Sequence, residues 1–347
     1  MSKLYDLLPV TTPAQKLAKD NCIAIFLVGS HLYGTSTPSS DFDYEGWFIE
    51  PPEYVIGNGS CLEVDFSTKS PSKFSDRNTP KDIDCKLYSL KNFFGLAMKN
   101  NPNKVEHFFI PDRNIVYKND KYYQKVIDAR DLFISLRSKH SFQGYAHSQK
   151  KKLLTKKLRL EELREFHLVL EKGLVDCDQP KVTIGDIFAA NWELDEWPYK
   201  YILKAKTEEG TPAIRIQEKE FNFGMDAQVI YEHVGSNLGR YGNRTLSLDD
   251  HGYDCKFASH LFRLYYEGLQ LLKEGTMEFP LVENKFLLSV KEGKYDLDYL
   301  LKRADEFEPL FEMAYLQSTL QKGPQQDKIS KLQQEIYLEW WREHKLI

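Results

Sequence analysis

The sequence lacks the features that mark a zinc-bound, disulfide-linked or membrane-spanning protein. Its cysteines are odd in number and never form a CxxC pair, which argues against a zinc site and a disulfide scaffold. We interpret them as small buried residues: Cys22, Cys61, Cys85, Cys177 and Cys255. The longest strongly apolar run, residues 23–28, is far too short to span a bilayer. The first residues also lack the charged-then-apolar order of a signal peptide, so we expect a cytoplasmic protein with no membrane partner.

The sequence also lacks a strong charge of either sign and shows no internal repeat. A formal net charge of −4 over 347 residues gives no overall field that would attract a polyanion. Binding of nucleic acid would therefore need a local basic patch. One dense basic segment exists, and an RNA backbone could dock on it, although a solvated helix face is the simpler interpretation: Lys150, Lys151, Lys152, Lys156, Lys157 and Arg159.

The hydrophobic pattern predicts an α/β (α+β) fold with a mixed sheet in an N-terminal domain, residues 1–115. The apolar run 23–28 is typical of a central strand, and residues 43–49 and 83–88 predict two further strands. Helices are expected at 13–21 and 90–98. The polar segment 67–81 has little to bury and predicts a mobile loop.

The rest of the chain, residues 116–347, is expected to form a mainly helical domain. Apolar residues recur at helical spacing over most of this length. Alternating and β-branched stretches interrupt the pattern and predict a small β-containing insertion at about residues 173–250.

Two aspartates near the start of the second predicted strand are the first candidates for chemistry. Asp41 and Asp43 stand at i and i+2, so their side chains leave one face of the chain roughly 7 Å apart. A pair of Mg²⁺ (or Mn²⁺) ions prefers carboxylates, phosphate oxygens and water, and such a pair needs a further carboxylate. Asp84, early in the third predicted strand, is the expected third ligand, and Asp82, on the same strand face, is the alternative.

A Gly-Ser pair at the end of the first predicted strand completes this group. Gly29 would allow the backbone to approach a phosphate closely, and Ser30 offers a hydroxyl and free N–H groups at a helix start. Taken singly, both patterns are common, and a plain turn with Asp41 as a helix cap is the structural alternative. Their order along the chain is what indicates a site.

The combined pattern resembles the signature of the DNA polymerase β superfamily, and within it the RNA-ligase-associated polymerase-like (RlaP-type) predicted nucleotidyltransferases. The segments that carry the resemblance are residues 29–34, 40–44 and 87–90 with Phe93 and Leu96, Asn101 to Asn103 with Glu106, and residues 256–264. The resemblance implies transfer of a nucleoside monophosphate from a nucleoside triphosphate. It also implies that Asp41, Asp43 and Asp84 are the metal carboxylates and that Gly29 and Ser30 form the triphosphate turn.

The later segment of this resemblance supplies three more candidates for nucleotide binding. Lys256, His260 and Arg263 stand at i, i+4 and i+7 of a predicted helix, so one helix face would present three basic groups to phosphates. A solvated charged face is the alternative. Among other residues of the motifs, His31 is either a turn residue or a nucleotide contact, and Asn101 to Asn103 with Glu106 are interpreted as a turn followed by a helix start.

The expected activity is metal-dependent nucleotidyl transfer to a hydroxyl acceptor. By analogy with the family, the preferred acceptor is an RNA 3′ end, a tRNA included, in RNA repair or tailing. One ion bound by all three aspartates would activate the acceptor hydroxyl, and a second bound by Asp41 and Asp43 would neutralise the triphosphate, ATP for example, and the leaving pyrophosphate. The alternatives are AMPylation-type modification of a protein or small molecule, and a non-catalytic nucleotide- or RNA-binding protein on the same scaffold.

Overall fold

The structure is a computed structural model, and it describes residues 5–6, 8–38, 40–68, 83–177, 181–193, 197–241 and 244–347. Contacts divide the chain into two compact units, each described by itself below. Unit 1 comprises Met1–Lys150 and Lys256–Ile347, and unit 2 comprises Lys151–Cys255. Most of the predicted mobile loop, and Asp82 with it, lies outside the described residues.

A mixed sheet forms the centre of unit 1. Five strands of the described chain follow the order β3-β4-β2-β1-β5, in which β2 and β4 are parallel and the other neighbouring pairs are antiparallel. The strands predicted from sequence correspond to β1, β2 and β4, whereas β3 and β5 were not predicted. The bounds are β1 Cys22–Leu27, β2 Phe42–Phe48, β3 Glu63–Asp65, β4 Ile83–Ser89 and β5 Ile115–Lys118.

The two faces of this sheet differ because successive side chains of a strand point to opposite sides. One face is apolar throughout, and Phe48, Cys85 and Leu87 pack there with residues of the N-terminal segment. The other face changes character along β2, from Asp43 through Glu45 to the fully buried Trp47. A polar site and an aromatic core therefore lie on the same face.

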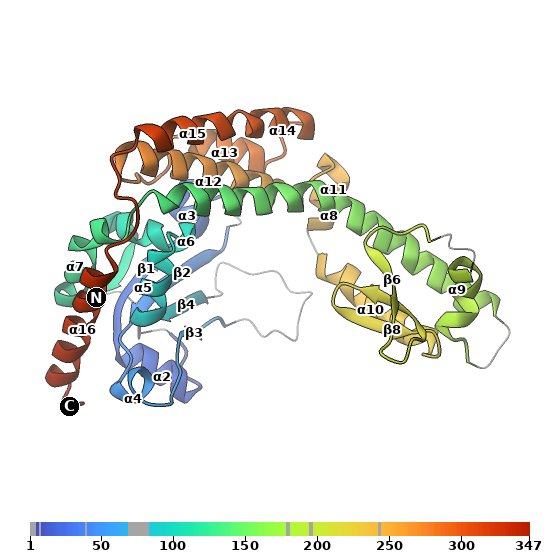
Figure 1. Cartoon of the computed structure of the whole chain (residues 1–347), viewed down its shortest axis with the longest axis horizontal. Coiled ribbons are helices and arrows are strands. Elements are labelled where there is room, and N and C mark those ends of the chain that lie inside the picture. Colours follow the sequence, from blue (N-terminus) through green and yellow to red (C-terminus); the bar gives the residue numbers. More distant parts are fainter. Residues whose placement is uncertain are drawn as a thin grey trace. The chain divides into compact units, whose positions relative to one another are not determined.

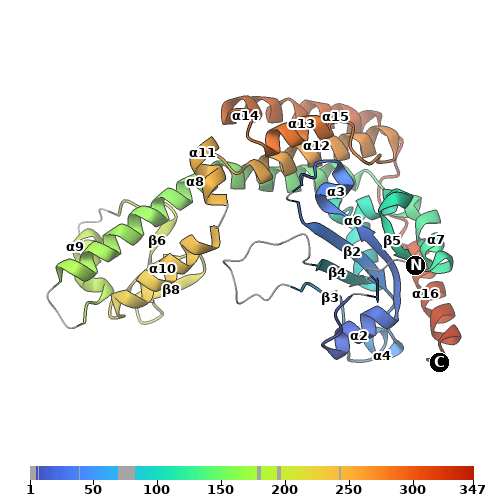
Figure 2. The same cartoon turned by 180° about the vertical axis from the view of Figure 1, so that it is seen from behind.

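Two groups of helices complete unit 1 (Figures 1 and 2). The N-terminal group is α2 Pro13–Asp20, α3 Gly29–Tyr33, α4 Pro52–Val55, α5 Leu90–Met98, α6 Pro102–Val105 and α7 Asp120–Asp128, with short 3₁₀ turns η1 Glu106–Phe109, η2 Asp112–Asn114 and η3 Arg130–Leu132. The C-terminal group is α12 Cys255–Glu274, α13 Asn284–Lys291, α14 Leu297–Asp305, α15 Phe307–Gln317 and α16 Gln326–Glu343. In both views α12 to α15 form one layer beside α3, and α16 lies near α7.

The last helix is joined to the sheet by specific hydrogen bonds. Trp341 Nε1 donates to the backbone oxygen of Glu50 at 2.8 Å, and Trp340 Nε1 donates to Asn21 Oδ1 at 3.0 Å. Tyr337 donates to the Glu50 carboxylate. These contacts explain why packing does not follow the expected division into 1–115 and 116–347, and instead groups the C-terminal helices with the sheet.

Unit 2 contains the predicted β insertion. Three of its described strands form an antiparallel sheet in the order β6-β7-β8. The apolar side chains of this sheet, including Ile202, Ile214 and Phe221, share one core with Phe166 and Leu170. Its elements are the second half of α8 Arg137–Asp176, α9 Ile184–Glu193, β6 Ile202–Lys206, β7 Pro212–Ile216, β8 Lys219–Asn222, α10 Ala227–Tyr241 and α11 Arg244–His251.

These elements confirm the fold class predicted from sequence: a mixed α/β sheet, a helical C-terminal region and a small β-containing insertion. The five cysteines are all free thiols, and three of them are buried. Within the described ranges, every helix is too short or too polar to cross a bilayer.

Candidate active site

The turn after β1 is shaped by two glycines. Gly29 has a φ of +65°, and a Cβ at this position would lie 2.4 Å from Asp43 Oδ2, so only glycine allows the carboxylate to pack against the backbone. Gly34 has a φ of +75° and ends α3, donating its N–H to the backbone oxygen of Ser30. The Gly-Ser turn therefore packs directly against the carboxylate of Asp43.

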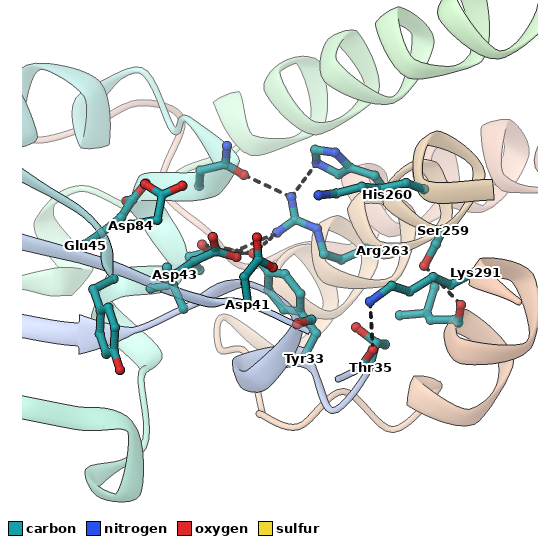
Figure 3. Close-up of a pocket in the computed structure, with 18 of the residues that line it drawn as sticks. Tyr33, Thr35, Asp41, Asp43, Glu45, Asp84, Ser259, His260, Arg263 and Lys291 are labelled. Carbon is teal, nitrogen blue, oxygen red and sulfur yellow. Dashed lines mark hydrogen bonds and ion pairs between the residues drawn. The ribbon is translucent and has the colours of Figure 1, made fainter. Parts of the chain in front are cut away.

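The parallel pairing of β2 and β4 brings the predicted carboxylates together. Asp43 and Asp84 are direct register partners, and Asp41 precedes Asp43 by two residues. All three line one cavity of about 400 Å³ (Figure 3). Asp84 also accepts a hydrogen bond from Ser67 Oγ at 3.0 Å. The neighbouring positions of Asp43 and Asp84 therefore follow from the sheet register.

This cavity also contains every other residue predicted for the site. Gly29 and Ser30 lie at its edge, and α12 supplies Lys256, His260 and Arg263. Residues from α3, β2, β4, α6, η1, α12 and α13 complete the lining: Val28, Tyr33, Thr35, Tyr44, Glu45, Lys86, Tyr88, Asn103, Glu106, Ser259, Leu287 and Lys291. Segments more than 200 residues apart in the sequence thus line the same cavity.

Asp43 is the electrostatic centre of the carboxylate group. Partial burial, with the charges of Asp41 and Asp84, raises its pKa to about 6, while Lys256 acts in the opposite direction. No hydrogen bond to its carboxylate is found within the described part of the chain. A nearby cation would stabilise the ionised form of a half-buried carboxylate that lies beside two like charges.

The three aspartates fit a divalent ion as a donor set. Hard carboxylate oxygens suit Mg²⁺ or Mn²⁺, and the lack of donors at Asp43 leaves its oxygens open to a cation. Among the described residues, no three His, Cys, Asp or Glu side chains are gathered as tightly as a finished metal site requires. Carboxylates repel one another when no cation lies between them, so a spread arrangement is compatible with a shared ion.

Lys291 is a cavity residue that the sequence reasoning missed. It ends α13, is about half-buried, and donates from Nζ to the backbone oxygen of Thr35 at 3.1 Å. Burial and the charge of Lys256 lower its pKa, whereas Asp41 and Asp43 raise it. Lys256 and Lys291 therefore face the carboxylates from two helices. No motif marks Lys291, and only the packing of α13 on α3 brings it there.

Arg263 is placed differently from the expectation that it clamps phosphates. Its side chain is 6% exposed, and its NH1 donates to Glu106 Oε2 at 2.9 Å, to Glu267 Oε1 at 3.2 Å and to the Tyr33 hydroxyl. NH2 contacts Asn103 Oδ1 at 2.9 Å and His260 Nε2. Because both terminal nitrogens have protein partners, Arg263 is the centre of a buried polar network at the cavity wall.

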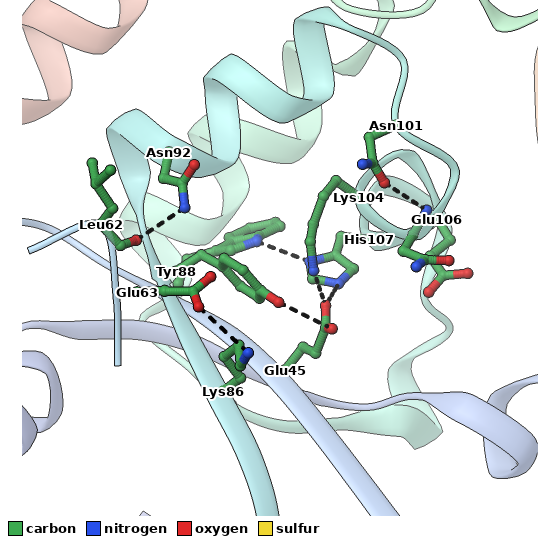
Figure 4. Close-up of polar contacts among 12 residues, drawn as sticks. Glu45, Leu62, Glu63, Lys86, Tyr88, Asn92, Asn101, Lys104, Glu106 and His107 are labelled. Carbon is green, nitrogen blue, oxygen red and sulfur yellow. Dashed lines mark hydrogen bonds and ion pairs between the residues drawn. The ribbon is translucent and has the colours of Figure 1, made fainter. Parts of the chain in front are cut away.

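Glu45 is the centre of a second network, on the opposite side of α6 and η1 (Figure 4). Trp47 Nε1 donates to His107 Nδ1 at 3.0 Å, so the ring hydrogen lies on Nε2, which donates to Glu45 Oε2 at 2.8 Å. Lys104 Nζ pairs with the same oxygen. Although burial alone would raise the pKa of Glu45, these partners lower it to about 2. Glu45 is therefore an ionised group that lines the cavity.

The basic segment on α8 is paired with acids at three of its lysines. Lys150 Nζ lies 2.5 Å from Asp305 Oδ1, and Lys156 Nζ lies 2.6 Å from Asp254 Oδ2. Lys157 pairs more weakly with Glu161 at 3.8 Å. These partners favour a helix face satisfied by the chain's own carboxylates over an RNA-binding surface.

His31 stacks on Phe42, with ring centroids 4.3 Å apart. It is absent from the cavity lining, and its Nε2 is buried without a hydrogen-bond partner in the described structure. The geometry therefore favours a packing role for His31 over a nucleotide contact.

Comparison with known families supports the assignment suggested by this site. Residues 16–169 match the model of a family described as the RNA repair pathway DNA polymerase beta family. The matched family is RlaP. This confirms the resemblance drawn from the motifs. The RlaP match includes the carboxylates, the Gly-Ser turn, α6 and η1, and ends before α12 and α13.

The chain is also similar to a phage protein. An uncharacterized 38.9 kDa protein from the nrdC-mobD intergenic region of Enterobacteria phage T4 is 29% identical over 282 residues. The alignment covers 77% of this chain and 81% of the phage protein, so it extends well beyond the segment matched by the RlaP model. No solved structure matches the chain.

Proposed function

We propose that this protein is a metal-dependent nucleotidyltransferase that transfers a nucleoside monophosphate from a nucleoside triphosphate to a hydroxyl acceptor. The observation that carries the proposal is the opposition of charges in one cavity. Asp43 and Asp84, paired on parallel strands, lie with Asp41 across from Lys256 and Lys291. Phosphoryl transfer needs this combination of cation ligands and phosphate-binding cations.

The two ends of the cavity have different tasks in this proposal. The Gly29–Ser30 turn, Lys256 and Lys291 bind the triphosphate, and the tether of Lys291 to Thr35 fixes its direction. Asp41, Asp43 and Asp84 would hold Mg²⁺ or Mn²⁺. When bound, such ions supply charge neutralisation of the phosphates and activation of the attacking hydroxyl.

The remaining polar residues position these groups. Arg263 binds Tyr33 and Glu106 and so holds α3 against η1 and α12. Lys104 and His107 hold Glu45 in place beside the carboxylates. These networks fix the cavity walls before substrate enters, and preorganised walls lower the cost of aligning the reacting groups.

We take the acceptor to be an RNA 3′ end, consistent with the description of the matched family as part of an RNA repair pathway. A hydroxyl on a protein or small molecule is the alternative acceptor. It is favoured by the ion pairs of Lys150 and Lys156 with acids, because these pairs leave RNA no extended basic surface on α8. Non-catalytic nucleotide binding is the other alternative. The presence of all three carboxylates in the cavity argues against it.

The test is incubation of the full chain with each α-³²P-labelled nucleoside triphosphate, Mg²⁺ or Mn²⁺, and total cellular RNA or total protein as acceptors. Label is expected in the RNA pool, with pyrophosphate released in proportion. Asp41→Ala and Asp43→Ala are expected to lower the rate by about 100-fold or more without unfolding. Asp298→Ala, at an exposed aspartate of α14, is the matched control. Retained transfer in both site variants would overturn the proposal.

A further inference from the structure

The cavity has a second polar end, away from the two lysines. In Figure 3, Asp41 and Asp43 lie in the middle of the cavity. Glu45 and Asp84 lie on one side of this pair, and Lys291, Thr35 and Ser259 lie on the other. We name Glu45, Tyr88 and Asn103 the acceptor wall. Glu45 is two residues beyond Asp43 on the same strand face, so it lies roughly 7 Å farther along the strand.

The side chain of Asn103 has a fixed orientation in this wall. The Arg263 guanidinium can only donate, and its NH2 lies 2.9 Å from Asn103 Oδ1, so the carbonyl oxygen of the amide must face Arg263. The opposite atom, Nδ2, then points away from Arg263. Across the described residues no hydrogen bond of Nδ2 is found, although Asn103 lines the cavity. Asn103 therefore presents an N–H donor that the protein leaves unused.

Glu45 presents the matching acceptor. Its Oε2 is occupied by Lys104 and His107, and its Oε1 receives only a long contact of 3.4 Å from the Tyr88 hydroxyl. Its side chain is 23% exposed and lines the cavity. Because Lys104 and His107 occupy one oxygen of this carboxylate, the other oxygen can accept a hydrogen bond from an external donor.

We propose that the acceptor wall binds the 2′-hydroxyl of the terminal ribose of an RNA acceptor, with Asn103 Nδ2 donating to the hydroxyl oxygen and Glu45 Oε1 accepting its hydrogen. This inference rests on the proposed function. A hydroxyl both donates and accepts, so a hydroxyl placed between these two side chains of one cavity would satisfy both unused groups. The ribose that carries the attacking 3′-hydroxyl must lie beside Asp43 and Asp84, and its neighbouring 2′-hydroxyl then reaches the next residues along β2. The wall therefore selects RNA ends over DNA ends.

The test compares two 5′-fluorescein-labelled oligoribonucleotides that differ only in a 2′-hydroxyl or 2′-deoxy terminal ribose. Their binding to the full chain is followed by fluorescence anisotropy, with a non-hydrolysable triphosphate and Mg²⁺ present. Loss of the two hydrogen bonds is expected to weaken binding by about 10-fold or more for the wild type. Binding needs no transfer, so this readout is separate from failure of the catalytic proposal.

Three variants locate the discrimination in the wall. Asn103→Asp keeps an oxygen for Arg263 and replaces the N–H donor, and Glu45→Gln replaces the acceptor with an amide. Both are expected to reduce the 2′-hydroxyl preference to within about 3-fold. Asn92→Asp on α5 makes the matched change outside the cavity and is expected to keep the full preference. Because Glu45→Gln also removes the partner of buried Lys104, its thermal unfolding is measured in parallel. Tyr88→Phe removes the weak donor to Glu45 Oε1 and is expected to keep the preference.

The possible results separate cleanly. A wild-type preference that collapses in Asn103→Asp, and in Glu45→Gln where that variant stays folded, supports the inference. Equal binding of the two oligonucleotides by the wild type, a preference unchanged in Asn103→Asp, or no binding of either oligonucleotide overturns it. In each of these cases, the transfer of labelled nucleotide to other acceptors is still read independently in the experiment described above.

Discussion

At the scale of single residues, Asp43 has the most demanding environment in the cavity. Its folded pKa of about 6 exceeds the ordinary value of 3.8 because burial and two aspartates oppose its charge. An acid with a raised folded pKa binds more protons in the folded than in the unfolded state between these two values. The free energy of unfolding therefore falls as pH rises from about 4 to 6, and the loss persists above pH 6 when no cation is bound.

Asp43→Asn is consequently expected to stabilise the protein at pH 7 in the absence of divalent ions. Allowing for solvent screening at this half-exposed site, the gain is about 1 kcal/mol, or a Tm increase of about 2 °C. The difference from wild type should shrink to a small fraction near pH 4, where Asp43 is protonated in the folded protein. Differential scanning calorimetry with EDTA at both pH values measures it. A variant less stable than wild type at pH 7 would contradict this account of Asp43.

Gly29 is the second residue with a sharp requirement. Gly29→Ala places a methyl group against Asp43 Oδ2 at a positive φ, so we expect a loss of about 1–2 kcal/mol in stability and a fall in transfer rate of at least about 10-fold. Gly95→Ala, in α5, has no atom within 4 Å of the added methyl group and is the control. It is expected to be neutral or stabilising in urea unfolding. Equal behaviour of the two variants would be inconsistent with the close packing of Gly29 on Asp43.

At the scale of elements, the segment formed by α6 and η1 organises both buried networks. Asn103 and Glu106, three residues apart, face Arg263, whereas Lys104 and His107, also three residues apart, face Glu45. The sequence indicates a turn and a helix start at Asn103 and Glu106. That is their backbone geometry, but the contacts show that their side chains also bind α12.

Arg263→Met removes the cation from this arrangement and leaves Glu106 and Glu267 buried without their partner. Breaking a buried ion pair by removing one member costs about 3–5 kcal/mol, and we expect that loss in the free energy of unfolding. Arg303→Met, on the partly exposed arginine of α14, is expected to cost within about 1 kcal/mol. Urea titrations followed by circular dichroism measure both. A loss at Arg263 no larger than at Arg303 would show that the network contributes little.

Helix α13, in the C-terminal group, contributes through Lys291. Lys291→Met is expected to raise the KM for nucleoside triphosphate by about 10-fold, because a phosphate oxygen loses a charged partner, while the acceptor KM changes little. Lys285→Met removes an exposed lysine from the same helix and should leave both constants unchanged. Steady-state kinetics with each substrate varied in turn gives the comparison. An effect confined to the acceptor KM would place Lys291 elsewhere in the reaction.

At the scale of the whole molecule, the sequence predicted what depends on local pattern and failed where distant segments meet. The central strand follows from its continuous apolar run and the Asp-x-Asp pair from its i, i+2 spacing, and the resemblance to a known family added the support of further motifs. Lys291 and the paired state of Arg263 depend on how α12 and α13 pack on the sheet, which no local pattern encodes. The sequence favoured a solvated face for the basic segment of α8, but it could not show that Asp305 and Asp254, distant in sequence, pair with Lys150 and Lys156.

The two units also divide the charge of the chain. Unit 2 contains 15 Lys and Arg against 19 Asp and Glu, so the net charge of −4 belongs to it and unit 1 is balanced. A net acidic unit does not attract a polyanion, which is consistent with placing the proposed binding of an RNA end in the cavity of unit 1.

The measurement that tests the central claim most directly is release of pyrophosphate from labelled nucleoside triphosphate, followed against Mg²⁺ concentration for the wild type and Asp43→Asn. The account predicts metal-dependent release with label transferred to an acceptor in the wild type, and no detectable release in a variant that is folded and at least as stable. Equal release by the two proteins, or release by neither with any base, metal or acceptor, would contradict it.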